Sequence, residues 1–168
     1  MGMNLTEMSL PLVRRRSAEN TYSHAGGVVS ILASTGDTGG AFALIDSLDH
    51  AGHEPVLHVH EREDLLIYVL EGRIDVMLGE EWKQLKQGDS IFLPRGVPHT
   101  YRVRTPVARS ITLITPGGFE EWFWKLGKPV SVFGFPDKAT RPTEEEFVRM
   151  LEVGERLGVR LLPESTPF

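Results

Sequence analysis

Hydrophobic residues alternate with polar ones, or form short runs, along the first two thirds of the chain, and turn-forming residues interrupt them every few positions. Runs rich in Val, Ile, Leu, Tyr and Phe with a period of two are typical of β-strands. Strands this short, with turns this frequent, favour an all-β sandwich or barrel. The pattern predicts strands at residues 28–33, 41–47, 56–60, 65–70, 73–78, 82–85, 90–93, 98–103 and 108–115.

Two later segments follow a helical period instead. Residues 119–126 begin after two glycines and carry acidic side chains in the first turn, where the helix dipole favours them. Residues 143–157 open with Thr143 and Glu146, the pair of a capping box, and Gly158 follows as a C-cap. The spacing i, i+3, i+4 predicts two apolar stripes, formed by Phe119, Trp122 and Phe123 and by Phe147, Met150 and Leu151.

The length of 168 residues suits one domain with a sizeable core. We expect an N-terminal arm at residues 1–25, a β-barrel at 26–116 and a C-terminal helical segment at 117–168 that packs on the barrel. The arm carries the basic run Arg14 to Arg16, which is typical of a solvated surface, and it could cross to a partner subunit.

Composition excludes several classes of function. The net charge of −5 argues against a nucleic-acid or anionic-membrane partner, because either favours a basic surface. The chain has no cysteine, so disulfides and thiol catalysis are excluded. No apolar run is long enough to span a bilayer, and the N-terminus lacks the apolar core of a signal peptide. We therefore expect a cytoplasmic protein that binds a small molecule.

Three histidines form the strongest chemical signal. His58 and His60 lie one residue apart on a predicted strand, so their imidazoles point to the same face. His99 follows a Pro-Arg-Gly turn in another hairpin. Three imidazoles brought together from two hairpins would make a metal site. The remaining histidines, His24, His50 and His53, belong to no motif and are expected in surface loops.

The glycines and histidines around these strands resemble the two motifs of the cupin superfamily. The first motif has the spacing of Gly52, His58, His60 and Gly72, and the second has that of Gly88, Pro94, Gly96 and His99. The flanking stretches GDTGGAFAL, TPGGFEEWF and RLGVRLL are similar to those of bacterial quercetin 2,3-dioxygenase-like small cupins. This resemblance implies a double-stranded β-helix, the jelly-roll barrel, and a homodimer.

Two positions depart from the family pattern. The glutamate that is the fourth metal ligand in the family falls on Leu65, and the asparagine that ends the second motif falls on Val103. Asp64 has the opposite parity to Leu65, so it could replace the glutamate only if a bulge shifted the register. Glu63 lies in the turn and is a lesser candidate. The simplest expectation is a site of three histidines with open positions for water or substrate.

Such a site would hold one divalent transition metal, and imidazole ligands suit Fe, Ni, Mn, Cu, Co and Zn alike. Three neutral imidazoles leave the full charge of the ion in the cavity, which favours an anionic ligand. The alternation of faces predicts that Leu65, Ile67, Val69 and Tyr101 line this pocket, and Tyr101 could hydrogen-bond a substrate. No catalytic residue is assigned.

The resemblance implies a metal-dependent dioxygenase that acts on a small, aromatic or enolisable anionic substrate. Leu65 favours an alternative, a non-catalytic ligand-binding cupin with a degraded metal site. A third interpretation is a cupin isomerase or epimerase, in which histidine and tyrosine act as acid and base. The flanking stretches argue against the third, although flanks report ancestry more than chemistry.

Overall fold

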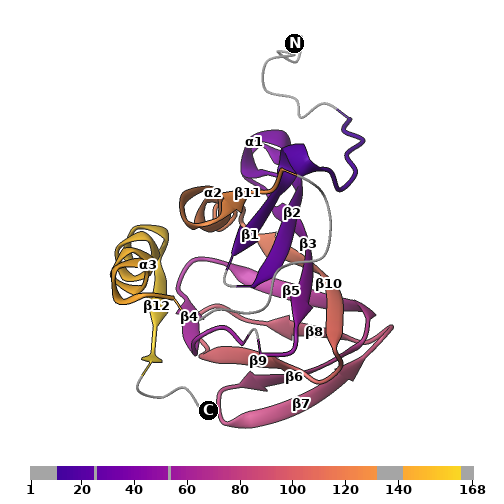
Figure 1. Ribbon diagram of the computed structural model, residues 1–168, viewed down its shortest axis with the longest axis vertical. Helices are drawn as coiled ribbons and strands as arrows, with labels where there is room; N and C mark the ends of the chain where they lie inside the picture. The colour runs from indigo at the N-terminus through magenta and orange to yellow at the C-terminus, as the bar shows by residue number, and fades with distance from the viewer. Residues whose placement is uncertain (1–10, 25, 53, 132–141, 164–168) are drawn as a thin grey trace, which may run out of the picture.

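The computed structural model describes residues 11–24, 26–52, 54–131 and 142–163. In this part of the chain the strands pair antiparallel in two sheets that enclose a common hydrophobic core, and the fold is a double-stranded β-helix, or jelly-roll barrel (Figure 1). The strands are β1 (Thr21–His24), β2 (Gly27–Ala33), β3 (Ala43–His50), β4 (His58–His60), β5 (Asp64–Glu71), β6 (Arg73–Leu78), β7 (Glu81–Lys86), β8 (Ser90–Leu93), β9 (His99–Val103), β10 (Val107–Thr115), β11 (Lys128–Pro129) and β12 (Val159–Leu161).

The seven-stranded sheet has the order β11-β1-β2-β3-β10-β5-β8, and the five-stranded sheet has the order β12-β4-β9-β6-β7. All nine predicted strands are present, with ends displaced by three residues at most. Strands β1, β11 and β12 were not predicted, because two to four residues are too few to display a period. Since β1 pairs with β2, the sheet begins before residue 26, inside the segment expected to be an arm.

The helices are α1 (Thr35–Thr38), α2 (Glu121–Leu126) and α3 (Glu144–Leu157), with a 3-10 turn, η2, at Ala18–Asn20. The predicted capping box is present: Glu146 N–H donates to Thr143 Oγ1 (3.2 Å), and Thr143 N–H donates to Glu146 Oε2 (2.9 Å). The predicted stripe of α3 is wrong at Leu151, which is 42% exposed, because the helix buries Val153 and Gly154 instead. No helix in the described ranges has the length and apolar character needed to cross a membrane.

The C-terminal elements hold the strand that carries two of the histidines. In Figure 1, α2 and α3 lie on the same side of the barrel, and β12 follows α3 directly. Strand β12 pairs with β4, with Val159 opposite His60 and Leu161 opposite His58. On its other side β4 pairs with β9, where His58 lies opposite His99. The short strand β4 is therefore fixed from both sides.

Strand β5 keeps a continuous register beside this site. Leu65 lies opposite Ile114 of β10 and Leu93 of β8, and the register shift between β5 and β10 falls far away, at Arg109 and Ser110. Leu65, Ile67 and Val69 point into the core, whereas Leu66 and Tyr68 are exposed, as the alternation predicted. No bulge occurs at Asp64 or Leu65.

Gly72 connects β5 to β6 in a conformation that requires glycine. Its φ of 79° lies in the left-handed region, and an added Cβ would meet Val107 O and Thr105 Oγ1 at 2.5 Å. This tight turn lets β6 return beside β9, where the third histidine lies.

Candidate metal centre

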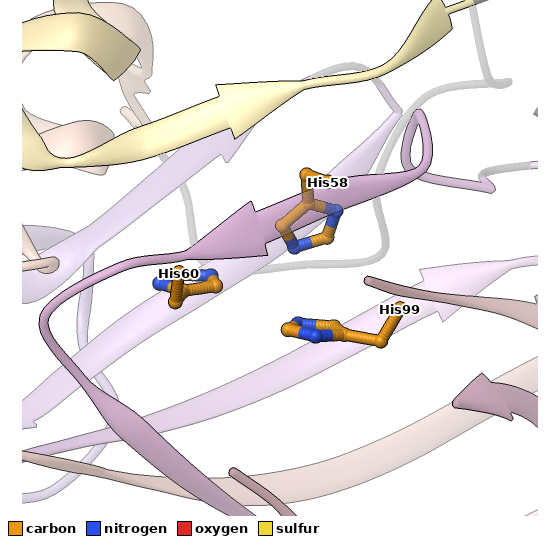
Figure 2. Close-up of side chains that lie close together, drawn as sticks. All are labelled: His58, His60 and His99. Atoms are coloured by element: carbon orange, nitrogen blue, oxygen red, sulfur yellow. The ribbon is translucent and has the colours of Figure 1, made fainter. Parts of the chain in front are cut away.

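The three motif histidines meet in one place. Figure 2 shows the rings of His58 and His60, carried by β4, gathered with that of His99, carried by β9. One nitrogen of each ring lies within 4.8 Å of the nitrogens of the other two. The turn before His99 is tied to the first motif, because Gly96 N–H donates to the carbonyl of His60 (2.8 Å). The backbone thus joins the two motifs directly.

Hydrogen bonds to backbone carbonyls fix the tautomer of two of the three imidazoles. Nδ1 of His58 lies 2.7 Å from the carbonyl of Val56, and Nδ1 of His99 lies 3.0 Å from the carbonyl of Val97. A carbonyl only accepts, so both rings carry their proton on Nδ1. Nε2 is then an unprotonated lone-pair donor. The Nε2 atoms of His60 and His99 are buried and have no hydrogen-bond partner.

Burial keeps these rings neutral. Desolvation lowers the pKa of His60 to about 3 and lowers the pKa of His99; it also lowers that of His58 well below the usual value. The charges of neighbouring rings add to the effect at His58 and His60. Neutral imidazole is the form that binds a metal ion, so no proton has to leave these rings at neutral pH.

Glu63, which the sequence made only a lesser candidate for a metal ligand, lies beside His60. The residue is only 4% exposed, and its Oε2 lies 3.4 Å from Nδ1 of His60. Burial raises the pKa of Glu63 to about 7, against the nearby guanidinium groups of Arg62 and Arg95, which lower it. A carboxylate behind a ligating histidine orients the ring and increases its basicity. His60 is therefore the one motif histidine backed by an acid rather than a carbonyl.

Leu65 occupies the position from which the family places its fourth ligand. It is buried and faces the cavity, so the structure places a hydrocarbon side chain where a carboxylate ligand would stand. Asp64 points to the surface and forms an ion pair with Arg95, whose Nη2 lies 2.8 Å from its Oδ2. The guanidinium lowers the pKa of Asp64 to about 2. Asp64 does not replace the missing ligand.

A cavity of about 200 Å³ adjoins the three histidines. Its lining is mainly apolar and includes Leu65, Ile67 and Tyr101, three of the four residues expected there. The fourth, Val69, faces the core but does not line the cavity. Tyr101 is half-buried, and its hydroxyl donates to Asp49 Oδ2 at 3.1 Å. Burial and the charge of Asp49 raise the pKa of Tyr101 well above its usual value, so it is a neutral hydrogen-bonding group.

Aromatic rings close the cavity beside His60. The ring of Phe119 lies 4.4 Å from that of His60, edge to face, and packs on Trp122. Nε1 of Trp122 donates to Nε2 of His24 at 3.2 Å. The expectation that His24 lies in a surface loop is wrong: it belongs to β1 and lines the cavity, because α2 covers that end of the barrel. His50 ends β3 near the carbonyl of Pro106, and His53 lies outside the described residues.

The donor set fits a transition-metal ion. One ring nitrogen of each of three neutral imidazoles lies in the cluster, and the Nε2 atoms of His60 and His99 are buried without a hydrogen-bond partner. Leaving such atoms unsatisfied is costly. Imidazole nitrogen suits Zn, Cu, Fe and Ni, among other divalent ions. Three protein ligands would leave positions open for a substrate, as catalytic metal sites require.

Comparisons with known proteins agree with this geometry. Residues 47–114 match the Cupin domain family. Quercetin 2,3-dioxygenase of Bacillus subtilis is 30% identical over 132 residues, which cover 79% of this chain and 38% of that protein. Quercetin 2,3-dioxygenase of Aspergillus japonicus is 31% identical over 121 residues, covering 63% and 34%. The chain thus spans little more than a third of the length of these relatives.

Solved structures show the same barrel. KdgF from Halomonas sp. superimposes with a TM-score of 0.52 at 26% identity, over 57% of this chain and 84% of that one. An RmlC-like cupin from Shewanella frigidimarina superimposes with a TM-score of 0.54 at 24% identity, over 60% and 86%. Residues 47–114 thus match a cupin domain, the barrel has the cupin fold, and the chain is similar in sequence to quercetin 2,3-dioxygenases, as its motifs predicted.

Proposed function

We propose that the protein is a metal-dependent dioxygenase acting on a small aromatic or enolisable anion. His58, His60 and His99 are the proposed ligands. The observation that carries this proposal is the convergence of one ring nitrogen from each histidine beside a mainly apolar cavity. The likeness to two quercetin 2,3-dioxygenases supports the reaction class.

Each group of residues around the cavity has a distinct role in this proposal. The histidines, held neutral by burial, bind the ion without contributing charge. Leu65 adds none either, so the open positions on the ion favour an anion. Phe119 and Trp122 shield the site from water, and the hydroxyl of Tyr101 is available to a polar substituent of the substrate. The bound metal would supply Lewis acidity toward the substrate oxygens and a route for reaction with dioxygen.

The first test measures metal content by elemental mass spectrometry on protein purified without chelator. We expect near-stoichiometric Fe, Ni, Mn or Cu, and its loss in His99→Ala. Oxygen uptake by the metal-loaded protein is then measured with enolisable aromatic compounds. A fully loaded protein that consumes no oxygen with any member of a broad panel would contradict the dioxygenase assignment.

Leu65 favours a second candidate, a cupin that binds a small ligand without turnover. A buried leucine at the ligand position removes a group that the family uses toward both metal and substrate. For this second candidate, we expect a ligand to raise the melting temperature of the protein while oxygen uptake stays at background. If no ligand of the panel stabilises the protein, this candidate fails as well.

A further inference from the structure

The size of the cavity restricts what can reach the three histidines. Its volume is about 200 Å³. An apolar cavity of about 150 Å³ is enough to bind benzene. Sites for drug-sized molecules usually occupy about 300–1,000 Å³. The cavity thus has room for one ring with its substituents and falls short of the range that a three-ring molecule needs.

The walls give little opportunity to enlarge it. Ile114 and Leu93 are almost completely buried, and Leu65 and Ile67 beside them are also part of the hydrophobic core. Leu65 pairs in register with Ile114 of β10 and Leu93 of β8, and Ile67 pairs with Thr112 and Ile91 of the same two strands. None of these side chains can move far without disturbing the sheet. Close packing makes such a wall resist added volume.

The polar groups are also spaced for a compact ligand. His99 and Tyr101 point to the same face of β9 two residues apart, which is about 7 Å along a strand. One ring with an oxygen at either end spans a similar length. Tyr101 and Asp49 form a partly buried hydrogen-bonded pair in the cavity lining, and this pair can bind a second polar group of the ligand.

Resting on the proposed function, we infer that the site takes a single-ring or equally compact anion and rejects three-ring flavonols. The ligand carries ionisable oxygens that face the three histidines and a further polar group near Tyr101 and Asp49. Ile67 is a specificity-determining residue in this inference, because its buried side chain forms part of the cavity wall on β5 and limits the volume available to a second ring.

The test is a series of probes that share one chelating head group and differ only in size. A 3-hydroxy-4-pyranone has the head group alone, 3-hydroxychromone adds one fused ring, and 3-hydroxyflavone adds a further phenyl ring. Melting temperature and calorimetric affinity are measured on metal-loaded protein. We expect the pyranone to stabilise the protein and to bind at least tenfold more tightly than 3-hydroxyflavone.

Two variants locate the restriction. Ile67→Ala enlarges the cavity, and we expect the preference for the pyranone over 3-hydroxyflavone to fall at least fivefold. Leu66→Ala is the matched control, since the neighbouring side chain is 40% exposed on the outer face of the same strand. It should leave the preference unchanged. Ile67→Val tests the same wall with a smaller loss of core volume, should the alanine variant fold poorly.

The outcomes separate this inference from the function on which it rests. Equal binding of all three probes by the wild-type protein would overturn the size limit and leave the metal site intact. If no probe binds although the metal is bound, the proposed function fails, and the inference fails with it. A change of preference in Leu66→Ala as large as that in Ile67→Ala would overturn the role assigned to Ile67.

Discussion

The two sheets meet across one cavity, and around the three histidines their inner faces contribute different side chains to it. The five-stranded sheet contributes three imidazole nitrogens, from β4 and β9. The seven-stranded sheet faces them there with the hydrocarbon side chains of Leu65, Ile67 and Ile114. In the family pattern the second wall carries a carboxylate ligand at position 65. The three histidines of the family pattern are thus kept here, and its carboxylate is replaced by a leucine.

The difference shows that an acidic side chain can act on the metal site without being a ligand of the ion. The carboxylate of Glu63 contacts His60 from behind and is not part of the cavity lining. From there it can strengthen one ligand without occupying an open position on the ion. The following predictions test this contrast between the two walls, from the largest expected effect to the smallest.

Removing a nitrogen ligand should nearly abolish metal binding. Binding free energies of about 10–16 kcal/mol for four-ligand zinc sites correspond to about 3 kcal/mol per ligand. We therefore expect His99→Ala to weaken metal affinity at least a hundredfold, measured by competition with a chromophoric chelator. His50→Ala is the control, because it removes an imidazole outside the cluster. Equal losses in both variants would refute the assignment of His99 as a ligand.

Restoring the carboxylate should strengthen binding of the ion. Leu65 faces the cavity in a regular register, so Leu65→Glu places an acid opposite the histidines. We expect metal affinity to rise about tenfold, since part of the gain offsets the cost of burying the acid. Binding of anionic probes should weaken at the same time. Leu65→Gln separates charge from shape, and a gain of the same size in that variant would show that charge is not the cause.

Neutralising Glu63 should weaken the site moderately. Changes behind a metal ligand typically cost about 10–100-fold in affinity, and we expect about tenfold for Glu63→Gln, which keeps the size and the acceptor oxygen. Isothermal titration gives the affinity, and the visible spectrum of the Co²⁺ form reports the ligand geometry. Glu61→Gln is the control, because Glu61 is exposed in the same turn. An unchanged affinity in Glu63→Gln would mean that His60 needs no acid behind it.

Much of the barrel could be predicted from the sequence, because alternation of apolar and polar residues has a physical cause in every buried strand. The same parity argument placed His58 and His60 on one face and turned Asp64 away from Leu65. The proximity of His99 came from the family motifs, since no local pattern connects β9 to β4. Strand β12 was missed, because three residues have no detectable period and their partner lies about a hundred positions earlier.

The details that shape the site depend on tertiary packing. Glu63 lies in the turn between β4 and β5, and no periodicity predicts where a turn residue points. His24 and Phe119 reach the cavity only because α2 covers the end of the barrel. The predicted place of Val69 in the cavity failed for a related reason: parity gives a face, and it does not say how far along that face the cavity extends.

The buried histidines should make the metal-free protein sensitive to acid. Their pKa values are lowered in the folded state, so the unfolded chain binds more protons as pH falls below about 6.5. Glu63, whose pKa is raised to about 7, acts in the opposite direction and offsets one of the three between pH 7 and 4.5. We expect the free energy of unfolding to fall by about 1 kcal/mol or more per pH unit below 6.5.

Urea unfolding of chelator-treated protein at pH 7.5, 6.0 and 5.0 measures this dependence. His60→Gln should weaken the pH dependence of the free energy of unfolding, because the variant lacks one of the three imidazoles that take up a proton more readily in the unfolded state. A free energy of unfolding that rises as the pH is lowered from 6.5 to 5 would mean that the effect of Glu63 outweighs that of the histidines.

The smallest effect is expected on the outer side of the second wall. Asp64 is adjacent to the empty ligand position in sequence, yet it forms an ion pair with Arg95 at the surface. We expect Asp64→Asn to change metal affinity less than twofold, because removing an acid that faces solvent leaves the cavity charge unaltered. The same calorimetric titration used for Glu63→Gln checks it. A tenfold loss would place Asp64 near the ion and require a register shift in β5. A small change in metal affinity for Asp64→Asn and a large one for Leu65→Glu would show that the face of the strand, rather than closeness in sequence, decides whether an acidic side chain affects the bound metal.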